Sequence, residues 1–256
     1  MEKDKQIEYM RYNERARSIL ASGPETIITG NLLGSTTIPL IFRTPYVHYE
    51  KLIKDLISAE HRVLELGAGT GLHTHALIQT GASVAASDIS SLSLEVIKKR
   101  LGPNVATSVA NMEELPFEAN SFDVVVCAGS LSYGDPDIVN AEINRVLRPG
   151  GAFICVDSLH HNPVYKLNRW INYIRGKRTK STIINMPTIK RINSISRNYS
   201  SIEVYYYGSL SWLMPLFSKF IGQDRAAKLS DLIDNLFKIK RSAFKFVMAA
   251  RGHKKF

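Results

Sequence analysis

The stretch "VLELGAGTG", residues 63–71, decides how this chain folds. An apolar run contains Glu65 near its end, and Gly67, Gly69 and Gly71 follow it. A short apolar run is typical of a buried strand, and glycines directly after it predict a tight turn that a ligand can approach closely. The G-x-G-x-G spacing differs from the G-x-G-x-x-G of a dinucleotide-binding turn, and a carboxylate beside it suits a cation better than a diphosphate.

Short apolar runs alternate with helical periodicity from residue 61 to residue 157. The predicted strands cover residues 61–67, 82–88, 104–110, 122–129 and 151–157, and the predicted helices cover residues 70–79, 92–101 and 136–147. Strand and helix follow one another without hairpin turns, which predicts an α/β fold with a doubly wound, mostly parallel sheet. Two later strands, at residues 201–208 and 243–251, make seven. Ligands of such a sheet bind outside the carboxyl ends of its strands.

Further motifs follow the glycines in a regular order. Asp88 closes the second strand, "ANMEELPFEANSFDVVV" (residues 110–126) precedes and enters the fourth, and "INRVLRPGGAFICVD" (residues 143–157) holds a helix, a Pro-Gly-Gly turn and the fifth. Together with the glycine stretch, these motifs resemble those of class I S-adenosylmethionine-dependent methyltransferases. The resemblance covers residues 61–157, and more weakly the last two strands.

The resemblance implies a Rossmann-like methyltransferase fold with S-adenosylmethionine as cofactor. It implies that Asp88 accepts the ribose hydroxyls, while the Asn111 side chain and the Met112 N–H contact the adenine; this family more often has Asp where the chain has Asn111. The implied cofactor-binding residues are Glu65, Gly67, Ala68, Gly69, Asp88, Ile89, Asn111 and Met112.

The 256 residues, of which 45% are hydrophobic, suffice for one α/β domain with helical cap insertions. We expect a helical cap at residues 1–58, a cofactor-binding core at 61–157, and the rest of the sheet with basic helical insertions at 158–256. Cys127 and Cys155 lie in apolar strands, which predicts buried, reduced thiols. The sequence contains neither a signal peptide pattern nor an apolar run of about 20 residues, so we expect a cytoplasmic protein.

The net charge of +10 is unevenly distributed. Residues 1–157 contain 14 Lys and Arg against 19 Asp and Glu, whereas residues 158–256 contain 19 against 4. The basic part is either a solvated face or a surface that attracts an anionic partner. Arg169, Arg175, Lys177 and Arg178 are candidates for holding a phosphate or diphosphate of a glycan or lipid-linked acceptor, with contact to the inner membrane surface as a further possibility.

Catalytic groups of this family commonly follow the fourth and fifth strands. There the chain has Tyr133, and the pair His160 and His161. An oxygen acceptor needs a base, so we expect His161, or else His160 or Tyr133, to take the proton of a hydroxyl. The alternative is that both histidines are ordinary loop residues. His73 and His75 lie two apart on a predicted helix and point to different faces, so we expect no metal site.

The acceptor stays open at this level. Residues 161–188 look similar to methyltransferases of bacterial surface-polysaccharide biosynthesis, which favours O-methylation of a sugar or polysaccharide precursor. Tyr12, Tyr46 and Tyr165 are among the cap aromatics that either stack on an acceptor or pack. The alternatives are a lipid or quinone methyltransferase that uses "WLMPLF" (residues 212–217) at a membrane surface, a nucleic-acid methyltransferase, and a non-catalytic module that binds S-adenosylmethionine.

Overall fold

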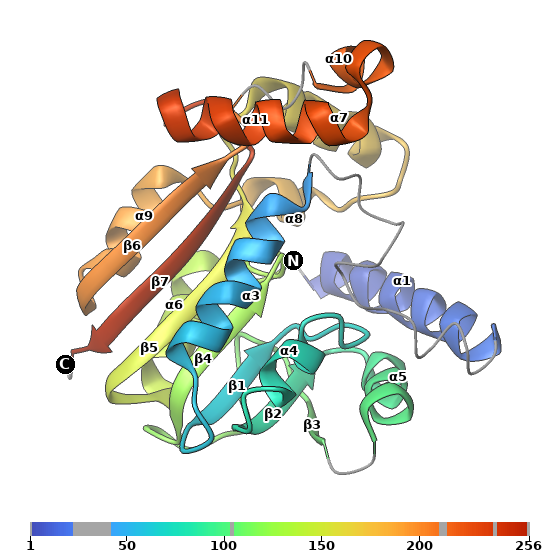
Figure 1. Ribbon diagram of the computed structural model, residues 1–256. Helices are drawn as coiled ribbons and strands as arrows, with labels where there is room; N and C mark the ends of the chain where they lie inside the picture. The colour runs from blue at the N-terminus through green and yellow to red at the C-terminus, as the bar shows by residue number, and fades with distance from the viewer. Residues whose placement is uncertain (1, 23–41, 103–104, 210–213, 238–239, 255–256) are drawn as a thin grey trace.

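The computed structural model describes residues 2–22, 42–102, 105–209, 214–237 and 240–254, and its centre is a seven-stranded sheet (Figure 1). The strands are β1 (Arg62–Leu66), β2 (Ser83–Asp88), β3 (Ala106–Val109), β4 (Phe122–Ala128), β5 (Leu147–Ser158), β6 (Tyr199–Tyr207) and β7 (Lys245–His253). They are ordered β3-β2-β1-β4-β5-β7-β6. β1 to β5 run parallel, and β7 is antiparallel to β5 and β6. The predicted Rossmann-like sheet is thus confirmed.

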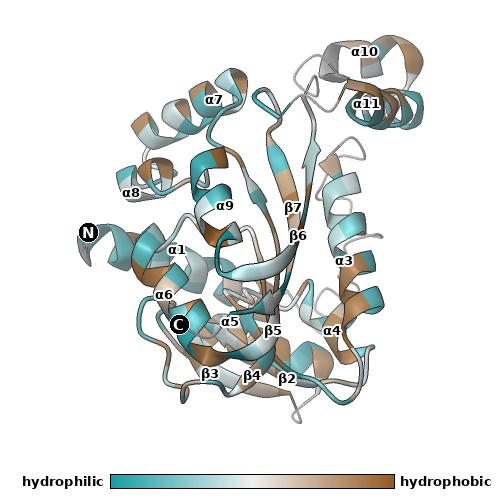
Figure 2. Cartoon of the chain, turned by 90° about the vertical axis from the view of Figure 1, so that its left-hand side faces the viewer, coloured by the Kyte–Doolittle hydropathy of each residue, from teal (hydrophilic) through white to brown (hydrophobic). Residues whose placement is uncertain are grey.

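Helices cover both faces of the sheet (Figure 2). Those nearest the strands are α3 (Thr44–Leu56), α4 (Thr74–Ile78), α5 (Ser91–Leu101), α6 (Pro136–Val146) and α9 (Ile189–Ser196). Val124 and Val126 of β4 pack in one apolar cluster with α3, whereas Val125 and Cys127 pack in another with α6 and α9. Alternate residues of a strand point to opposite faces, so a strand covered on both sides is apolar throughout.

The helix after the glycine turn is shorter than predicted. The sequence pattern indicated residues 70–79, but α4 covers only Thr74–Ile78. Gly67, Gly69 and Gly71 have φ angles of +64°, +55° and +81°, in the left-handed region. A right-handed helix cannot include such residues, so the chain continues as turns until it reaches α4.

Two further predictions concern β5. The fifth strand was expected at residues 151–157, but β5 covers Leu147–Ser158 and therefore includes the Pro-Gly-Gly turn. At this turn the pairing of β5 with β4 shifts its register, between Phe122 and Val124 of β4. Cys127 and Cys155 are paired in register across β4 and β5, and both are buried free thiols as predicted.

The remaining helices lie near the carboxyl ends of the strands (Figure 1). They are α1 (Glu2–Ala21), α7 (Pro163–Ile174), α8 (Lys180–Ile184), α10 (Met214–Ile221) and α11 (Gln223–Phe237). The expected helices after β5 and before β7 are therefore present, although Trp212 and Leu213 of the "WLMPLF" segment lie outside the described residues. Among the described helices, none is both long and apolar enough to cross a bilayer.

Candidate active site

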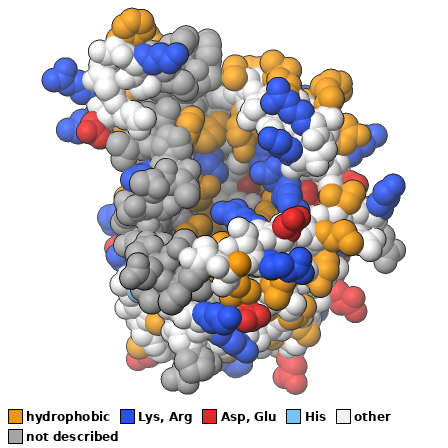
Figure 3. Space-filling model, turned by 90° about the vertical axis from the view of Figure 1, so that its right-hand side faces the viewer, with side chains coloured by type: hydrophobic (Ala, Val, Ile, Leu, Met, Phe, Trp, Pro, Cys, Tyr) orange, Lys and Arg blue, Asp and Glu red, His pale blue; other side chains and the backbone are white. Residues whose placement is uncertain are grey.

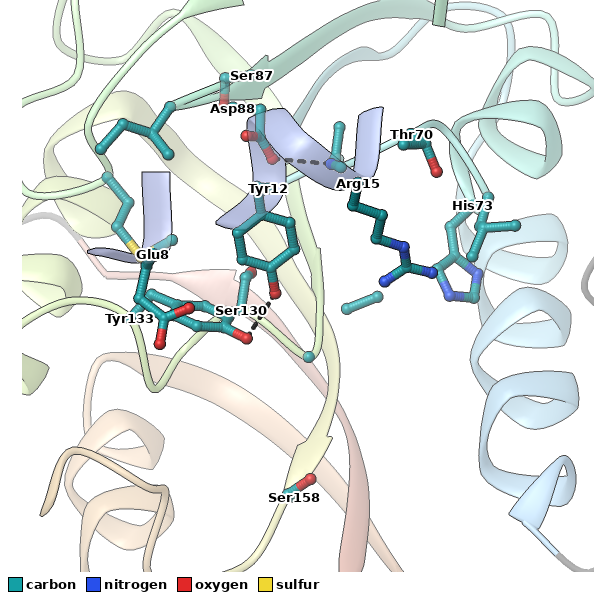
Figure 4. A pocket seen from close by; sticks show the side chains of 18 of the residues that line it. Glu8, Tyr12, Arg15, Thr70, His73, Ser87, Asp88, Ser130, Tyr133 and Ser158 are labelled. Atoms are coloured by element: carbon teal, nitrogen blue, oxygen red, sulfur yellow. Dashed lines mark hydrogen bonds between the residues drawn. The ribbon is translucent and has the colours of Figure 1, made fainter. Parts of the chain in front are cut away.

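A pocket of about 420 Å³ lies at the carboxyl ends of β1, β2, β4 and β5 (Figure 4). Gly67, Asp88, Gly129 and Ser158, each at or just beyond the end of one of these strands, line it. Its volume is within the range of small-molecule sites. Residues of α1, among them Tyr12 and Arg15, line the pocket from the opposite side.

The glycine turn is fixed by Asp88. One Asp88 carboxylate oxygen accepts the Gly69 N–H at 2.8 Å, and the other accepts the Ser90 N–H at 2.8 Å. A Cβ at Gly69 would meet no atom within 4 Å, whereas a Cβ at Gly67 would lie 2.6 Å from the Ser130 Cβ. Gly67 is therefore required by packing against Ser130, just after β4, and Gly69 leaves an open backbone face where a ligand can approach.

The structure brings most of the predicted cofactor residues together. Those that line the pocket are Gly67, Ala68, Gly69, Asp88, Ile89, Asn111 and Met112. The Asn111 side-chain oxygen accepts the Glu113 N–H at 3.1 Å, which holds the side chain in place. Glu65 is not among the lining residues; it is buried, and its carboxylate accepts the Thr74 hydroxyl at 2.6 Å.

Glu65 is electrostatically unusual. Burial raises the pKa of its carboxyl group to about 8, and the nearby Asp88 charge adds to this effect, while the hydrogen bond from Thr74 opposes it. Burial also raises the pKa of Asp88, against the hydrogen bonds from Ser90 and Gly69. Two acidic groups thus lie beneath one glycine turn. A cationic ligand at this end of the pocket would favour the charged form of both.

Tyr133 lies in the pocket as predicted, and its hydroxyl oxygen is surrounded by hydrogen-bonding groups. The Tyr12 hydroxyl is 2.5 Å away (Figure 4), and the Arg178 and Arg11 guanidinium groups donate at 2.8 Å and 3.3 Å. Tyr133 is therefore a candidate for accepting a proton.

The structure brings neither His160 nor His161 into the lining of this pocket. The exposed His161 ring accepts the Ile189 N–H at its Nε2 atom, 3.1 Å away. Burial lowers the pKa of His160, and Lys166 and His161 lower it further. Ser158, the last residue of β5, lines the pocket, whereas the two histidines do not, and their role as a base stays a prediction.

His73 and His75 point in different directions, as the sequence suggested. His73 lines the pocket, stacks on Tyr46 with ring centroids 5.5 Å apart and contacts Glu50, whereas the exposed His75 contacts Gln79. Within the described residues, no group of three or more His, Cys, Asp or Glu side chains could hold a metal ion.

The basic residues divide into two groups. Arg169 and Arg178 line the pocket, whereas Arg175 and Lys177 are exposed and do not line it. Sequence reasoning missed Lys245, although a single lysine in the apolar run "AFKFVMAA" is a detectable signal. It also assigned no role to the pocket-lining residues Lys5, Glu8, Arg15 and Ser158.

Comparison with known proteins agrees with this arrangement. Residues 64–155 match the family model described as a methyltransferase domain. This segment of the chain is therefore similar to methyltransferase domains. Enzymes of this class use S-adenosylmethionine, and the open Gly69 backbone, the buried acidic groups and the pocket volume fit this ligand.

Individual relatives match the same part of the chain. An uncharacterized methyltransferase of Mycobacterium tuberculosis is 41% identical over 96 residues, which cover 38% of this chain and 39% of the relative. A demethylmenaquinone methyltransferase of Clavibacter sepedonicus is 39% identical over 103 residues, or 38% and 40% of the two chains. The chain thus spans about two fifths of these relatives' length.

A solved structure extends the likeness of fold to most of the chain. The phosphoethanolamine N-methyltransferase 2 of Haemonchus contortus, in complex with S-adenosylmethionine, superposes with a TM-score of 0.61 and 18% identity. The match covers 94% of this chain and 60% of that one. The sheet and its helices therefore belong to the methyltransferase fold, beyond the segment that the family model matches.

Replacing Asp88 by Ala should weaken S-adenosylmethionine binding. The variant loses the carboxylate that holds the Gly69 N–H and that can accept the ribose hydroxyls. Each charge-assisted hydrogen bond contributes about 1.5–3 kcal/mol, so the Kd from isothermal titration should rise at least tenfold. Asp123→Asn is the control, because Asp123 accepts the Arg62 N–H and pairs with Arg148 outside the pocket lining. Equal Kd values for all three proteins would contradict the role of Asp88.

Glu65 should make the free protein less stable as the pH rises. Its pKa of about 8 in the folded state lies above the ordinary value of 4.5, so the folded state retains a proton that the unfolded chain loses between these values. The free energy of unfolding therefore falls across this range, by at most about 1.4 kcal/mol per pH unit. Urea denaturation at pH 5, 7 and 9 should show a weaker pH dependence for Glu65→Gln. Identical pH dependence in both proteins would refute a raised pKa at Glu65.

Proposed function

We propose that the protein transfers a methyl group from S-adenosylmethionine to a hydroxyl group of a small molecule or glycan precursor. The observation that carries this proposal is the lining of one pocket. It contains the glycine turn and Asp88 together with the polar side chains of Tyr133, Ser158 and Tyr165. S-adenosylmethionine, when bound, supplies an electrophilic methyl group. The protein must then align an acceptor oxygen with it and keep water out.

Helix α1 is well placed to exclude water from the reaction. It contributes Tyr12 and Arg15 to the pocket lining. Two hydrogen bonds hold α1 in position. The Thr179 hydroxyl donates to Glu8 at 3.0 Å, and the Ser181 N–H donates to Asp4 at 2.9 Å. These contacts join the first helix of the chain to the segment after α7, and the acceptor end of the pocket lies between them.

Tyr133 is the residue that we assign to proton transfer. An acceptor hydroxyl becomes a stronger nucleophile as it loses its proton, and a phenolate oxygen can take that proton. The guanidinium groups of Arg11 and Arg178 both donate to the Tyr133 oxygen, which fixes the position of that oxygen at the pocket wall. Tyr133 also lies after β4, which pairs with β1, the strand that leads into the glycine turn.

A sugar or a polysaccharide precursor suits this lining. Tyr12, Tyr46 and Tyr165 add aromatic surface to the pocket, and sugar rings stack favourably on such surface while their hydroxyls bond to polar neighbours. The assignment to polysaccharide biosynthesis is a prediction that the named relatives do not test.

A second candidate acceptor is a lipid or quinone taken from a membrane surface. The relative from Clavibacter sepedonicus is named for a quinone substrate, demethylmenaquinone. Helix α7, beside the pocket, exposes the apolar side chains of Val164, Leu167, Ile171 and Ile174. Exposed apolar residues on a helix with basic neighbours are typical of an interfacial contact.

One experiment tests the proposal and separates the two acceptor classes. The protein is incubated with methyl-labelled S-adenosylmethionine and with separate water-soluble and lipid extracts, and the products are identified by mass spectrometry. We expect label on oxygen in a water-soluble or glycan product. Label only in a quinone or lipid product would favour the second candidate, and no transfer to either extract would count against the proposed activity.

Tyr133→Phe should abolish most turnover while S-adenosylmethionine still binds. Loss of a general base typically lowers kcat by roughly 10²–10⁴. Turnover with the identified acceptor and the Kd for the cofactor are measured for this variant and for His160→Ala and His161→Ala, which should keep most activity because neither histidine lines the pocket. If a histidine variant loses turnover and Tyr133→Phe keeps it, the proton-transfer role belongs to that histidine.

A further inference from the structure

Helix α7 has an unusual orientation. Its one buried residue is Arg169, which is 8% exposed, whereas Leu167 and Ile174 are 59% and 66% exposed. An amphipathic helix on a globular protein normally packs its apolar face inward. Here the helix instead presents an arginine to the pocket. An arrangement that buries a charge and exposes apolar surface requires a compensating interaction.

The Arg169 guanidinium is only partly satisfied by the protein. Its Nε and Nη2 atoms donate to the Tyr165 hydroxyl at 3.3 Å and 3.0 Å, and its buried Nη1 atom has no hydrogen-bond partner among the residues that the structure describes. Arginine presents its donors in a planar fork that matches the oxygens of a phosphoryl or carboxylate group. The free Nη1 donor of this pocket-lining residue is therefore available to a ligand.

Lys245 is a second buried cation in the same lining. It is 8% exposed, and the register of β5 and β7 places it opposite Ser158. Its ammonium group lies 4.7 Å from the centroid of the Tyr46 ring. Ser158 in turn hydrogen-bonds the Tyr165 hydroxyl at 2.9 Å, so β5, β7 and α7 converge on one polar cluster.

Neither of these two cations is paired with a carboxylate of the described residues, although the nearby Asp157 acts on Lys245 electrostatically. The nearby Asp157 carboxylate accepts the N–H groups of Leu131 and Ser158. The sequence contains no acidic residue between Asp157 and Glu203.

The acidic residues of the pocket lie elsewhere. Glu8 and Asp88 are the carboxylates in its lining; Glu8 pairs with Arg11, and Asp88 holds the glycine turn. Figure 3 shows Lys and Arg side chains around the hollow on this side of the molecule. Buried charges in proteins are normally paired, so the missing partner is an anion that comes with the ligand.

We propose that Arg169 and Lys245, together with the Ser158 and Tyr165 hydroxyls, bind an oxyanion of the methyl acceptor, a phosphoryl or carboxylate group. As a statement about the acceptor, this assignment rests on the proposed function. The Tyr165 oxygen accepts from Arg169, so its own hydrogen can be donated to the anion or to Ser158. The same pocket contains Tyr133, so one acceptor molecule can contact the oxyanion subsite and the proton-accepting residue together.

Direct binding of small anions tests the subsite without knowledge of the acceptor. Inorganic pyrophosphate and acetate, as phosphoryl and carboxylate probes, are titrated into the full chain by calorimetry. We expect at least one probe to bind, and Lys245→Met and Arg169→Met each to weaken it roughly tenfold to a hundredfold. Arg169→Lys, which keeps the charge without the fork, should retain part of the affinity. Arg175→Met, at an exposed position just after α7, is the matched control and should bind as the unmodified protein does.

Thermal unfolding without anions gives an independent measurement. Replacing an unpaired buried cation by an apolar residue of similar length is often neutral or stabilising, so Lys245→Met should melt no lower than the unmodified protein. Absence of binding by both probes at tens of millimolar, or unchanged binding in both Met variants, overturns the proposal. A separate S-adenosylmethionine titration tests the proposed function by itself. If the cofactor fails to bind, while the anion probe binds and the Met variants lose that binding, the anion subsite is supported and the methyltransferase proposal is contradicted.

Discussion

The Asp88 carboxylate ties the end of β2 to the glycine turn after β1, through hydrogen bonds to the Gly69 and Ser90 N–H groups. The rest of the site depends on this contact. It holds a turn of left-handed glycines in place, leaves the Gly69 backbone open, and delays the start of α4. Because the strand order reverses between β1 and β4, their connections leave toward opposite faces and a crevice opens at this position.

The pocket is electrostatically divided. Asp88 lines its glycine end with Glu65 buried beneath, whereas Arg178, Arg169 and Lys245 line it with the residues that follow β5. A low dielectric constant strengthens the interaction of each charge with a ligand. Charged groups that are already in position need no rearrangement when the ligand binds. With this division, the cationic cofactor would lie toward Asp88 and the proposed anionic acceptor toward the residues after β5. The uneven charge of the chain, acidic before residue 158 and basic after it, contributes to this division, although Lys5 and Arg15 of α1 also line the pocket.

The sequence predicted the strands well because each strand core is a short apolar run, and it predicted the glycine turn because only glycine tolerates those φ angles. It did not predict the length of α4, which depends on how far the left-handed turn extends. The sequence also showed no sign that Ser158, at the end of β5, lines the pocket with Lys245. Ser158 and Lys245 are 87 positions apart in the sequence, and the antiparallel pairing of β5 with β7 brings them together. No local pattern predicts that register. The hydrogen bond between the His161 ring and the Ile189 N–H likewise joins residues that are distant in the sequence, and no local pattern predicts it.

The orientation of α7 follows from one residue. A helix that turns Arg169 toward the pocket must turn Val164, Leu167, Ile171 and Ile174 away from it, because 3.6 residues per turn place these positions on the far side. Polar side chains there would keep the helix soluble at no cost to the pocket, yet the chain has apolar ones. Departures from local rules of this kind concentrate at functional sites. The buried arginine is explained by an anion inside the pocket, whereas the outward apolar face favours contact with an apolar surface outside it. On the proposed function, an acceptor with an anionic group and a lipid tail, such as a lipid-linked glycan, would satisfy both faces of the same helix.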